Sequence, residues 1–167
     1  MDNYKEQIVK IKKTTSVYFI QSLIWLMAAA ICVVCFYAIK ISPIFILVGA
    51  LSIYVAFKLN GQFNIEYEYT ITNGLIDIDK IINKEIRKEI ISFEVKSIEN
   101  VSKFNKDFKK NNAGKLFICT DNFDKGIVLT VNIQTIGKCF IAFSPNEDIK
   151  KMIKVYAPRN LKNEFDN

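Results

Sequence analysis

Two cysteines, Cys32 and Cys35, have the spacing of a thiol redox motif. Redox chemistry of this kind needs a solvent-accessible thiolate at the start of a helix. Both residues instead lie inside an uncharged run, so we interpret them as small apolar packing residues. The other two cysteines, Cys119 and Cys139, fall in predicted strands. They would stay reduced in the cytosol, and a disulfide between them would require an extracellular domain.

The chain contains no histidine, which excludes mechanisms that need an imidazole base or metal ligand. Asp77 and Asp79 would share one strand face, but a hard cation needs more oxygen ligands than two carboxylates supply. The segment 121–126 has acidic residues and a glycine like a calcium loop, without the later bidentate glutamate, so we interpret it as a turn. We therefore predict no catalytic residue, metal or cofactor, and no enzyme activity.

A basic segment with two phenylalanines is the strongest candidate for a binding surface. Lysines beside aromatic rings suit the anionic inner face of a bacterial membrane. If the segment is helical, its two rings share one face at a spacing of four residues. The alternative is a solvated loop with one ring packed onto the domain. The candidate residues are Lys103, Phe104, Lys106, Phe108, Lys109 and Lys110, with Lys115 close behind.

The elements that must position these residues change character at about Leu59. Residues 14–39 carry no charge, and neither do residues 41–57. The first run is long enough to cross a bilayer and too long for a signal peptide. Two buried helices of a soluble bundle would each show a polar stripe, which is absent here. We therefore predict a transmembrane hairpin over residues 14–59, with helices at about 15–39 and 42–59.

Lysines predict the orientation of this hairpin. Ser42 and Pro43 read as the N-cap and first position of the second helix, so the turn is short and the helices are antiparallel. Four lysines precede the first helix and Lys58 follows the second, whereas the turn has only Lys40. The positive-inside rule then places both termini in the cytoplasm of a multi-pass protein of the cell inner membrane.

Charge is unevenly divided along the chain. The net charge is +6, of which residues 1–60 carry +4 and residues 61–167 carry +2. A nearly balanced second part argues against nucleic-acid binding. We interpret residues 1–13 as a basic cytosolic flank that fixes topology, although Ile8 and Ile11 among the lysines also fit a short amphipathic helix on anionic lipid.

Residues 61–160 predict a cytosolic β domain, followed by a polar tail at 161–167. Strict alternation runs from Phe63 to Thr72, and Asn73-Gly74 then predicts a tight hairpin. Ser144, Pro145 and Glu147 have the spacing of a capping box for a final helix. That helix has an apolar face of Ile149, Met152, Ile153 and Tyr156 and ends before Pro158. The other strands are expected at Leu75–Ile82, Ile86–Val95, Lys115–Thr120, Ile127–Gln134 and Lys138–Phe143.

An antiparallel meander closed by one C-terminal amphipathic helix is typical of a pleckstrin-homology-like bent sheet or barrel. The segment Tyr67–Ile82 and the start of the last helix at Phe143-Ser144-Pro145 resemble an uncharacterised family of small bacterial two-helix membrane proteins with such a domain. The resemblance implies this fold but no activity. Eukaryotic members of the fold bind phosphoinositides through basic residues at the first hairpin loop. Here that loop is Thr72-Asn73-Gly74, so this binding mode is not expected.

These observations predict a non-catalytic binding or adaptor module held at the inner leaflet, with the lipid bilayer and an unknown protein as partners. Only Asn60-Gly61-Gln62 would separate the second helix from the first strand, which keeps the domain close to the membrane. The alternative is a structural subunit of a membrane assembly. In that case the hairpin would form homo-oligomers through small residues at positions 28–30 and 49–50.

Overall fold

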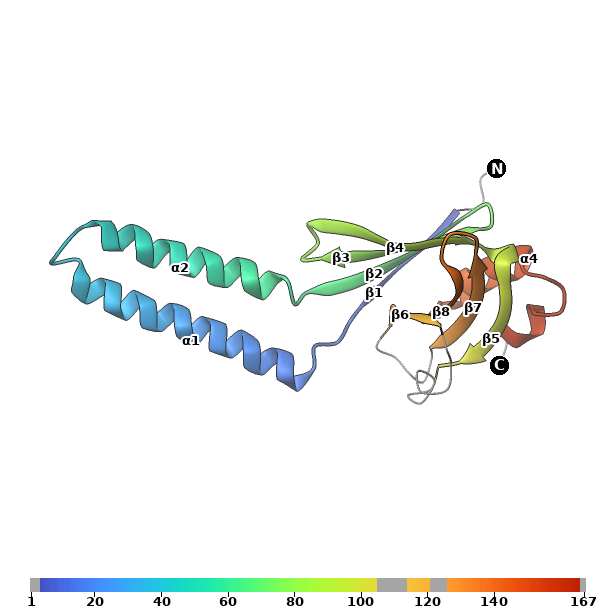
Figure 1. Ribbon diagram of the computed structural model, residues 1–167, viewed down its shortest axis with the longest axis horizontal. Coiled ribbons are helices and arrows are strands. Elements are labelled where there is room, and N and C mark those ends of the chain that lie inside the picture. Colours follow the sequence, from blue (N-terminus) through green and yellow to red (C-terminus); the bar gives the residue numbers. More distant parts are fainter. Residues whose placement is uncertain (1–3, 105–113, 121–125, 166–167) are drawn as a thin grey trace. The chain divides into compact units, whose positions relative to one another are not determined.

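The computed structural model describes residues 4–104, 114–120 and 126–165 (Figure 1). The chain forms two compact units. The helical unit holds residues 12–65 together with the turn at 82–85. The β unit holds residues 1–11, 66–81 and 86–167.

The helical unit is an antiparallel pair, α1 (Thr15–Ala38) and α2 (Ile44–Gly61), as predicted (Figure 1). The helices pack through small buried residues, Ala28 and Cys35 on α1 and Gly49 and Ala56 on α2. Small side chains let two helix backbones approach closely. Cys32 also faces α2, because its Sγ lies 3.6 Å from Ser52 Oγ. The interpretation of the cysteine pair as packing residues is therefore confirmed.

The second helix begins two residues later than predicted. Pro43 occupies the N-cap position, and Ser42 Oγ accepts a hydrogen bond from the Ile44 amide at 3.5 Å. Proline has no amide hydrogen to leave unsatisfied at a helix start, so either position near the N-terminus accommodates it. The helix also continues to Gly61, so residues 62–64 rather than 60–62 lead into the next strand.

The first sheet has the strand order β1-β2-β3-β4. The last three strands are the predicted meander, and the bounds are β1 (Tyr4–Lys10), β2 (Ile65–Thr72), β3 (Leu75–Ile82) and β4 (Ile86–Glu94). Asn73 and Gly74 join β2 to β3 with φ values of 52° and 87°. Asn83 and Lys84 join β3 to β4 with φ values of 52° and 58°. Positive φ at both central residues is what a tight type I′ hairpin requires.

Strand β1 replaces the flank or amphipathic helix that we expected within residues 1–13. It pairs antiparallel with β2, from Tyr4 opposite Thr72 to Lys10 opposite Glu66. Gln7 and Val9 are half-buried, whereas the lysines of the strand are exposed. The partner strand is more than fifty residues away in the chain, so the local pattern of β1 gave no sign of the pairing.

The second sheet has the order β5-β7-β8-β6. A single 3₁₀ turn, η1 (Val95–Ser97), leads from β4 into it. Strand β6 runs parallel to β8, and the other pairs are antiparallel. The β unit thus has two mostly antiparallel four-stranded sheets, and over the described residues they do not close into the barrel that was one of the two predicted forms. The strands are β5 (Ile98–Lys103), β6 (Lys115–Ile118), β7 (Ile127–Ile133) and β8 (Gly137–Phe143).

The final helix, α4 (Glu147–Tyr156), has the predicted apolar face, with Ile149 and Ile153 fully buried. Its N-cap is Asn146 rather than Ser144, because the Asn146 side chain accepts the Ile149 amide hydrogen bond at 2.9 Å. After α4, the 3₁₀ turn η2 (Lys162–Phe165) buries Phe165 in the core. That part of the chain is therefore not the polar tail that we predicted.

One hydrophobic core holds the β unit together. It takes side chains from β2, β3 and β4 of the first sheet, from β5, β7 and β8 of the second, and from α4. Its largest fully buried members are Tyr69, Ile71, Ile76, Ile78, Leu129, Ile141, Phe143, Ile149 and Ile153.

Candidate functional site

The predicted basic surface is only partly within the described residues. Lys103 is exposed at the end of β5. The Phe104 ring is 6% exposed and packs against Val128, Phe140 and Ala142, so it belongs to a core rather than to a surface. This is the arrangement of the alternative interpretation, in which one ring packs onto the domain. Lys106, Phe108, Lys109 and Lys110 lie outside the described residues.

Lys115 is exposed at the start of β6, and its Nζ lies 4.9 Å from the centre of the Phe117 ring. This is a cation–π distance. The segment 121–126, which we interpreted as a turn, is described only at Gly126, whose carbonyl accepts the Phe104 amide hydrogen bond at 2.9 Å. Asp77 accepts a hydrogen bond from Ser92 Oγ at 2.5 Å, which is a structural contact between β3 and β4.

The order of elements ties the helical hairpin directly into the first sheet. Strand β1 leads through residues 11–14 into α1, and α2 leads through residues 62–64 into β2. Because β1 and β2 are neighbours with Lys10 opposite Glu66, the hairpin takes the place of the loop in a two-stranded β-ribbon. Both ends of the hairpin therefore start from the same end of one strand pair.

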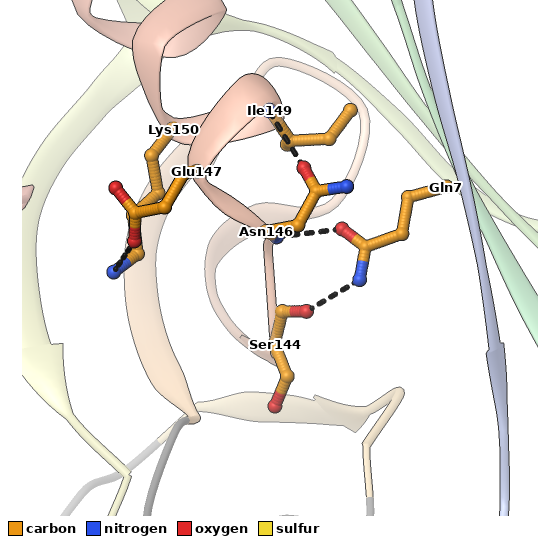
Figure 2. A network of polar contacts seen from close by, with 6 residues as sticks. All are labelled: Gln7, Ser144, Asn146, Glu147, Ile149 and Lys150. Atoms are coloured by element: carbon orange, nitrogen blue, oxygen red, sulfur yellow. Dashed lines mark hydrogen bonds and ion pairs between the residues drawn. The ribbon is translucent and has the colours of Figure 1, made fainter.

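A single glutamine fixes β1 to the start of α4, as Figure 2 shows. Gln7 Nε2 donates to the Ser144 carbonyl at 3.0 Å, and Gln7 Oε1 accepts from the Asn146 amide at 2.7 Å. The carboxamide thus pairs with backbone groups on both sides of residue 145. The Asn146 side chain meanwhile caps the helix through the Ile149 amide. Sequence reasoning missed Gln7, because a glutamine in a charged strand has no local signal of such a role.

A buried polar cluster joins the two sheets beside this contact. The Tyr69 hydroxyl, on β2, donates to the Cys119 carbonyl at 2.7 Å. The Ser144 amide approaches the same hydroxyl at 3.5 Å, and the Ser144 side chain lies 2.7 Å from Thr120 Oγ1. Ser144 is therefore engaged by its neighbours and is not available as the helix cap. Buried polar groups that are satisfied in this way specify one packing arrangement.

A carboxyl pair lies across β1 and β2. Glu68 is 4% exposed, and burial is the main cause that raises its pKa, with the hydrogen bond to Glu6 second. The pKa of Glu6 is lowered, chiefly by a hydrogen bond from Tyr4. Arg87 Nη2 lies 2.6 Å from Glu68 Oε2 as an ion pair, without the alignment of a hydrogen bond. Glu68 falls on the polar face of the predicted strand, so alternation alone indicated an exposed residue.

The two thiols of the β unit have low reactivity. Cys119 and Cys139 are free and buried. Burial raises the pKa of Cys119 to about 12 and also raises the pKa of Cys139, against a smaller opposing effect of Lys115. Because the thiolate is the reactive form, neither residue is placed to act as a nucleophile at neutral pH.

The helical hairpin presents an apolar surface. Both helices are long and apolar enough to cross a membrane. Apart from the small packing residues and Gly61, their side chains are exposed or half-exposed. Large aromatic rings are among them, including Tyr18, Trp25 and Phe57. Lys58, near the end of α2, pairs with Glu85 at 3.3 Å. Contiguous apolar surface of this extent marks a site of membrane or protein contact.

A family model described as "Bacterial PH-like domain (DUF6106)" matches residues 1–163. The match covers nearly the whole chain, and the chain therefore belongs to this bacterial PH-like family. The resemblance to an uncharacterised PH-like family is confirmed, and the family description assigns no activity. No curated protein and no solved structure matches the chain.

Proposed function

We propose that this bacterial PH-like protein is a non-catalytic binding or adaptor module, which its two-helix hairpin holds at the inner face of the cell membrane. The observation that carries the proposal is the insertion of an exposed apolar hairpin between the paired strands β1 and β2. Strand pairing brings the two ends of the hairpin together. A hairpin with both ends on one side of a bilayer fits this connectivity, whereas one end on each side would break the pairing.

Charge supports a cytoplasmic β unit. Lys10, Lys12 and Lys13 precede α1 and Lys58 lies in the last turn of α2, whereas Lys40 is alone at the far end of the hairpin. Lysines near helix ends stay preferentially on the cytoplasmic side. Short connections on both sides, residues 11–14 and 62–64, restrict the reach of the β unit to the membrane surface and to proteins that lie against it.

Cysteine labelling in intact cells tests the orientation. The native thiols Cys119 and Cys139 are buried, so they would resist a reagent on either side and cannot report topology. Two exposed positions serve instead, Asn100→Cys on β5 and Lys40→Cys at the turn of the hairpin. With an impermeant maleimide, we expect labelling at position 40 in intact cells and at position 100 only after permeabilisation. Labelling at position 100 in intact cells would refute the proposed orientation.

The binding role is tested by cross-linking the full-length protein in its native membrane. A variant with Lys106, Lys109 and Lys110 replaced by serine removes three positive charges from the predicted surface. A matched variant with Lys150, Lys151 and Lys154 replaced by serine removes the same charge from α4. Loss of cross-linked partners or of lipid contacts in the first variant alone is expected. Equal loss of these contacts in both variants, or no loss in either, would count against this surface.

A structural subunit is the second candidate, and one groove favours it. The groove has a volume of about 490 Å³ and lies between α1 and α2, lined almost entirely by apolar side chains. Another copy of the hairpin could place an apolar helix there. Ala28 and Gly49 are already used inside the hairpin, whereas Ala29, Ala30 and Ala50 remain exposed. Blue-native electrophoresis in mild detergent separates the candidates, because a strictly monomeric species would exclude the subunit role.

A further inference from the structure

A second hollow lies within the helical unit, on the end of the hairpin that carries Lys58. It has a volume of about 460 Å³, within the range of small-molecule sites. Its walls come from the first turns of α1, the last turn of α2 and the turn between β3 and β4. The polar lining consists mainly of side-chain amides, from Gln21, Asn60, Asn64 and Asn83. No carboxylate lines it among the described residues.

Helix pairing places this pocket at the membrane boundary. Gln21 Nε2 donates to the Asn60 carbonyl at 3.2 Å, so these residues lie at the same level of the hairpin. From Gln21 to the end of α1 at Ala38 the helix rises ~26 Å, close to the thickness of the hydrocarbon layer. Residues at the level of Gln21 therefore lie where phospholipid headgroups begin, if the hairpin spans the membrane as proposed.

Two of the lining amides, those of Gln21 and Asn83, have their oxygens engaged and can offer their nitrogens as hydrogen-bond donors. Lys13 Nζ donates to Gln21 Oε1 at 3.3 Å, and Asn64 Nδ2 donates to Asn83 Oδ1 at 3.3 Å. These contacts occupy the amide oxygens of Gln21 and Asn83. A carboxamide nitrogen carries two hydrogens, so Gln21 keeps one beyond its bond to the Asn60 carbonyl, and Asn64 keeps one beyond its bond to Asn83. Lys13 adds a positive charge at the rim.

The position of Asn83 is fixed by its surroundings. The backbone N–H of Asn83 donates to the backbone carbonyl of Asn64 at 2.8 Å, in addition to the hydrogen bond between the two side chains. The residue adopts a left-handed conformation with φ of 52°, which asparagine tolerates better than most residues. Gly61 makes room for the side chain, because a Cβ there would lie 2.9 Å from Asn83 Cγ. The side-chain nitrogen of Asn83, a hydrogen-bond donor, is thus held in place before any ligand binds.

Aromatic rings form the apolar part of the wall. Tyr18, Trp25 and Phe57 line the pocket, and Lys13 Nζ lies 6.0 Å from the centre of the Tyr18 ring. Tyrosine and tryptophan are the residues that favour the membrane interface, because their rings are amphipathic and sit at the level of the headgroups. An anion with a short apolar extension matches this combination of donors, one cation and rings.

We propose that this pocket binds the headgroup of an anionic phospholipid. The phosphate oxygens would accept hydrogen bonds from the amide nitrogens of Gln21 and Asn83 and face Lys13, and the glycerol would contact the rings. A free phosphate ester offers the same oxygens without the acyl chains. The site rests on the proposed membrane insertion, and it is separate from the basic segment considered above.

Native mass spectrometry of the full-length protein in detergent tests the assignment, with phosphatidylglycerol, phosphatidylcholine and glycerol 3-phosphate as probes. Asn83→Asp keeps the size and backbone preference of the residue but replaces a donor with a negative charge. Asn100→Asp makes the same charge change on an exposed strand. We expect Asn83→Asp to weaken phosphatidylglycerol retention by about tenfold or more, since hydrogen bonds to charged groups are the strong ones. Asn100→Asp should behave as the unmodified chain.

A second pair of variants guards against misfolding of the first. Lys13→Gln should weaken phosphatidylglycerol retention, and Lys12→Gln, with the same loss of charge one residue earlier, should have a smaller effect. Equal effects of the two would indicate general attraction to the bilayer and overturn the pocket assignment. Equal retention of phosphatidylcholine, or binding of glycerol 3-phosphate as tight as that of the lipid, would overturn the choice of ligand.

Membrane insertion is measured separately by alkaline carbonate extraction of cell membranes. Release of the protein would refute the proposed function, and the pocket assignment with it. Retention of the protein in the membrane, together with unchanged lipid binding by Asn83→Asp and Lys13→Gln, would refute the pocket assignment alone.

Discussion

Replacing Tyr69 with phenylalanine tests whether the buried polar cluster holds the two sheets together. The substitution removes one hydroxyl and keeps the ring that packs edge-on against Phe143, with ring centres 5.3 Å apart. The Cys119 carbonyl then loses the donor that now lies 2.7 Å away, in a residue that is 1% exposed. No space opens for water to replace a hydroxyl inside a close-packed core.

The expected cost follows from this unsatisfied acceptor. Leaving a buried carbonyl without its donor costs about 1–3 kcal/mol, so we expect the free energy of unfolding of the β unit to fall by about 2 kcal/mol. With a urea dependence of about 1–2 kcal/mol per molar for a small domain, the midpoint should fall by about 1–2 M.

Thiol labelling measures this change in the full-length protein. Cys119 and Cys139 are buried with raised pKa values, so they react only when the β unit opens. Labelling at each residue is followed by mass spectrometry of the corresponding peptides across a urea series. Tyr67→Phe is the matched control on the same strand face, because the Tyr67 hydroxyl forms no hydrogen bond within the described residues.

The reasoning would be refuted if Tyr69→Phe shifted the midpoint no further than Tyr67→Phe. Such a result would mean that the Cys119 carbonyl finds another donor, or that the cluster forms only a small part of the contact between the sheets. A shift seen at Cys139 but not at Cys119 would also contradict the reasoning, because both thiols belong to one core.

Three further predictions concern the same unit. The first two are read by the same labelling, and the third by circular dichroism across a urea series at each pH, because thiols label too slowly in acid. Gly74→Ala should destabilise the β unit by at least ~1 kcal/mol more than Gly137→Ala. Both glycines have positive φ, but only a Cβ at Gly74 would clash with the Tyr156 side chain, at 2.9 Å. Equal destabilisation by the two substitutions would exclude that clash. Gln7→Leu should cost about 1–2 kcal/mol through two lost hydrogen bonds, and no change would show that β1 docks without them. Because the folded pKa of Glu68 is raised, its contribution to stability is complete below its ordinary value of 4.5 and is lost as pH rises through the folded value. The free energy of unfolding should therefore fall less above pH 4.5 in Glu68→Gln than in the unmodified protein. Parallel curves of unfolding free energy against pH for the two proteins would refute this prediction.

Local chemistry predicted the elements whose partners are close in sequence. Strand β3 has the predicted bounds, Leu75–Ile82, because the Asn73-Gly74 turn fixes its start and the Asn83-Lys84 turn fixes its end. The apolar face of α4 followed from helical spacing, and the packing role of the cysteine pair followed from its place in an uncharged run. In each case the information lies within about ten residues of the element.

The missed elements depend on distant or irregular partners. Strand β1 is charged and gains its identity from β2, which lies beyond the whole hairpin. Strand β5 was not predicted, because its register shifts between Ile98 and Asn100 and this breaks the alternation of buried and exposed residues. The helix cap was placed two residues early because Ser144 is engaged by Tyr69 and Thr120. The polar pocket of the hairpin could not be predicted either, since its amides come from three separate segments of the chain.

The placement of the hairpin between β1 and β2 also constrains how the protein is made. Strand β1 leaves the ribosome first, but its partner follows only after residues 11–64 have been synthesised. Closing a flexible segment of that length, compared with a two-residue turn, costs about 3 kcal/mol of chain entropy. The paired helices remove most of this cost, because they already hold the two ends of the segment near each other. Completion of the first sheet is therefore thermodynamically linked to assembly of the hairpin, and a chain whose helices fail to pair would leave β1 unpaired and β2 as an open edge.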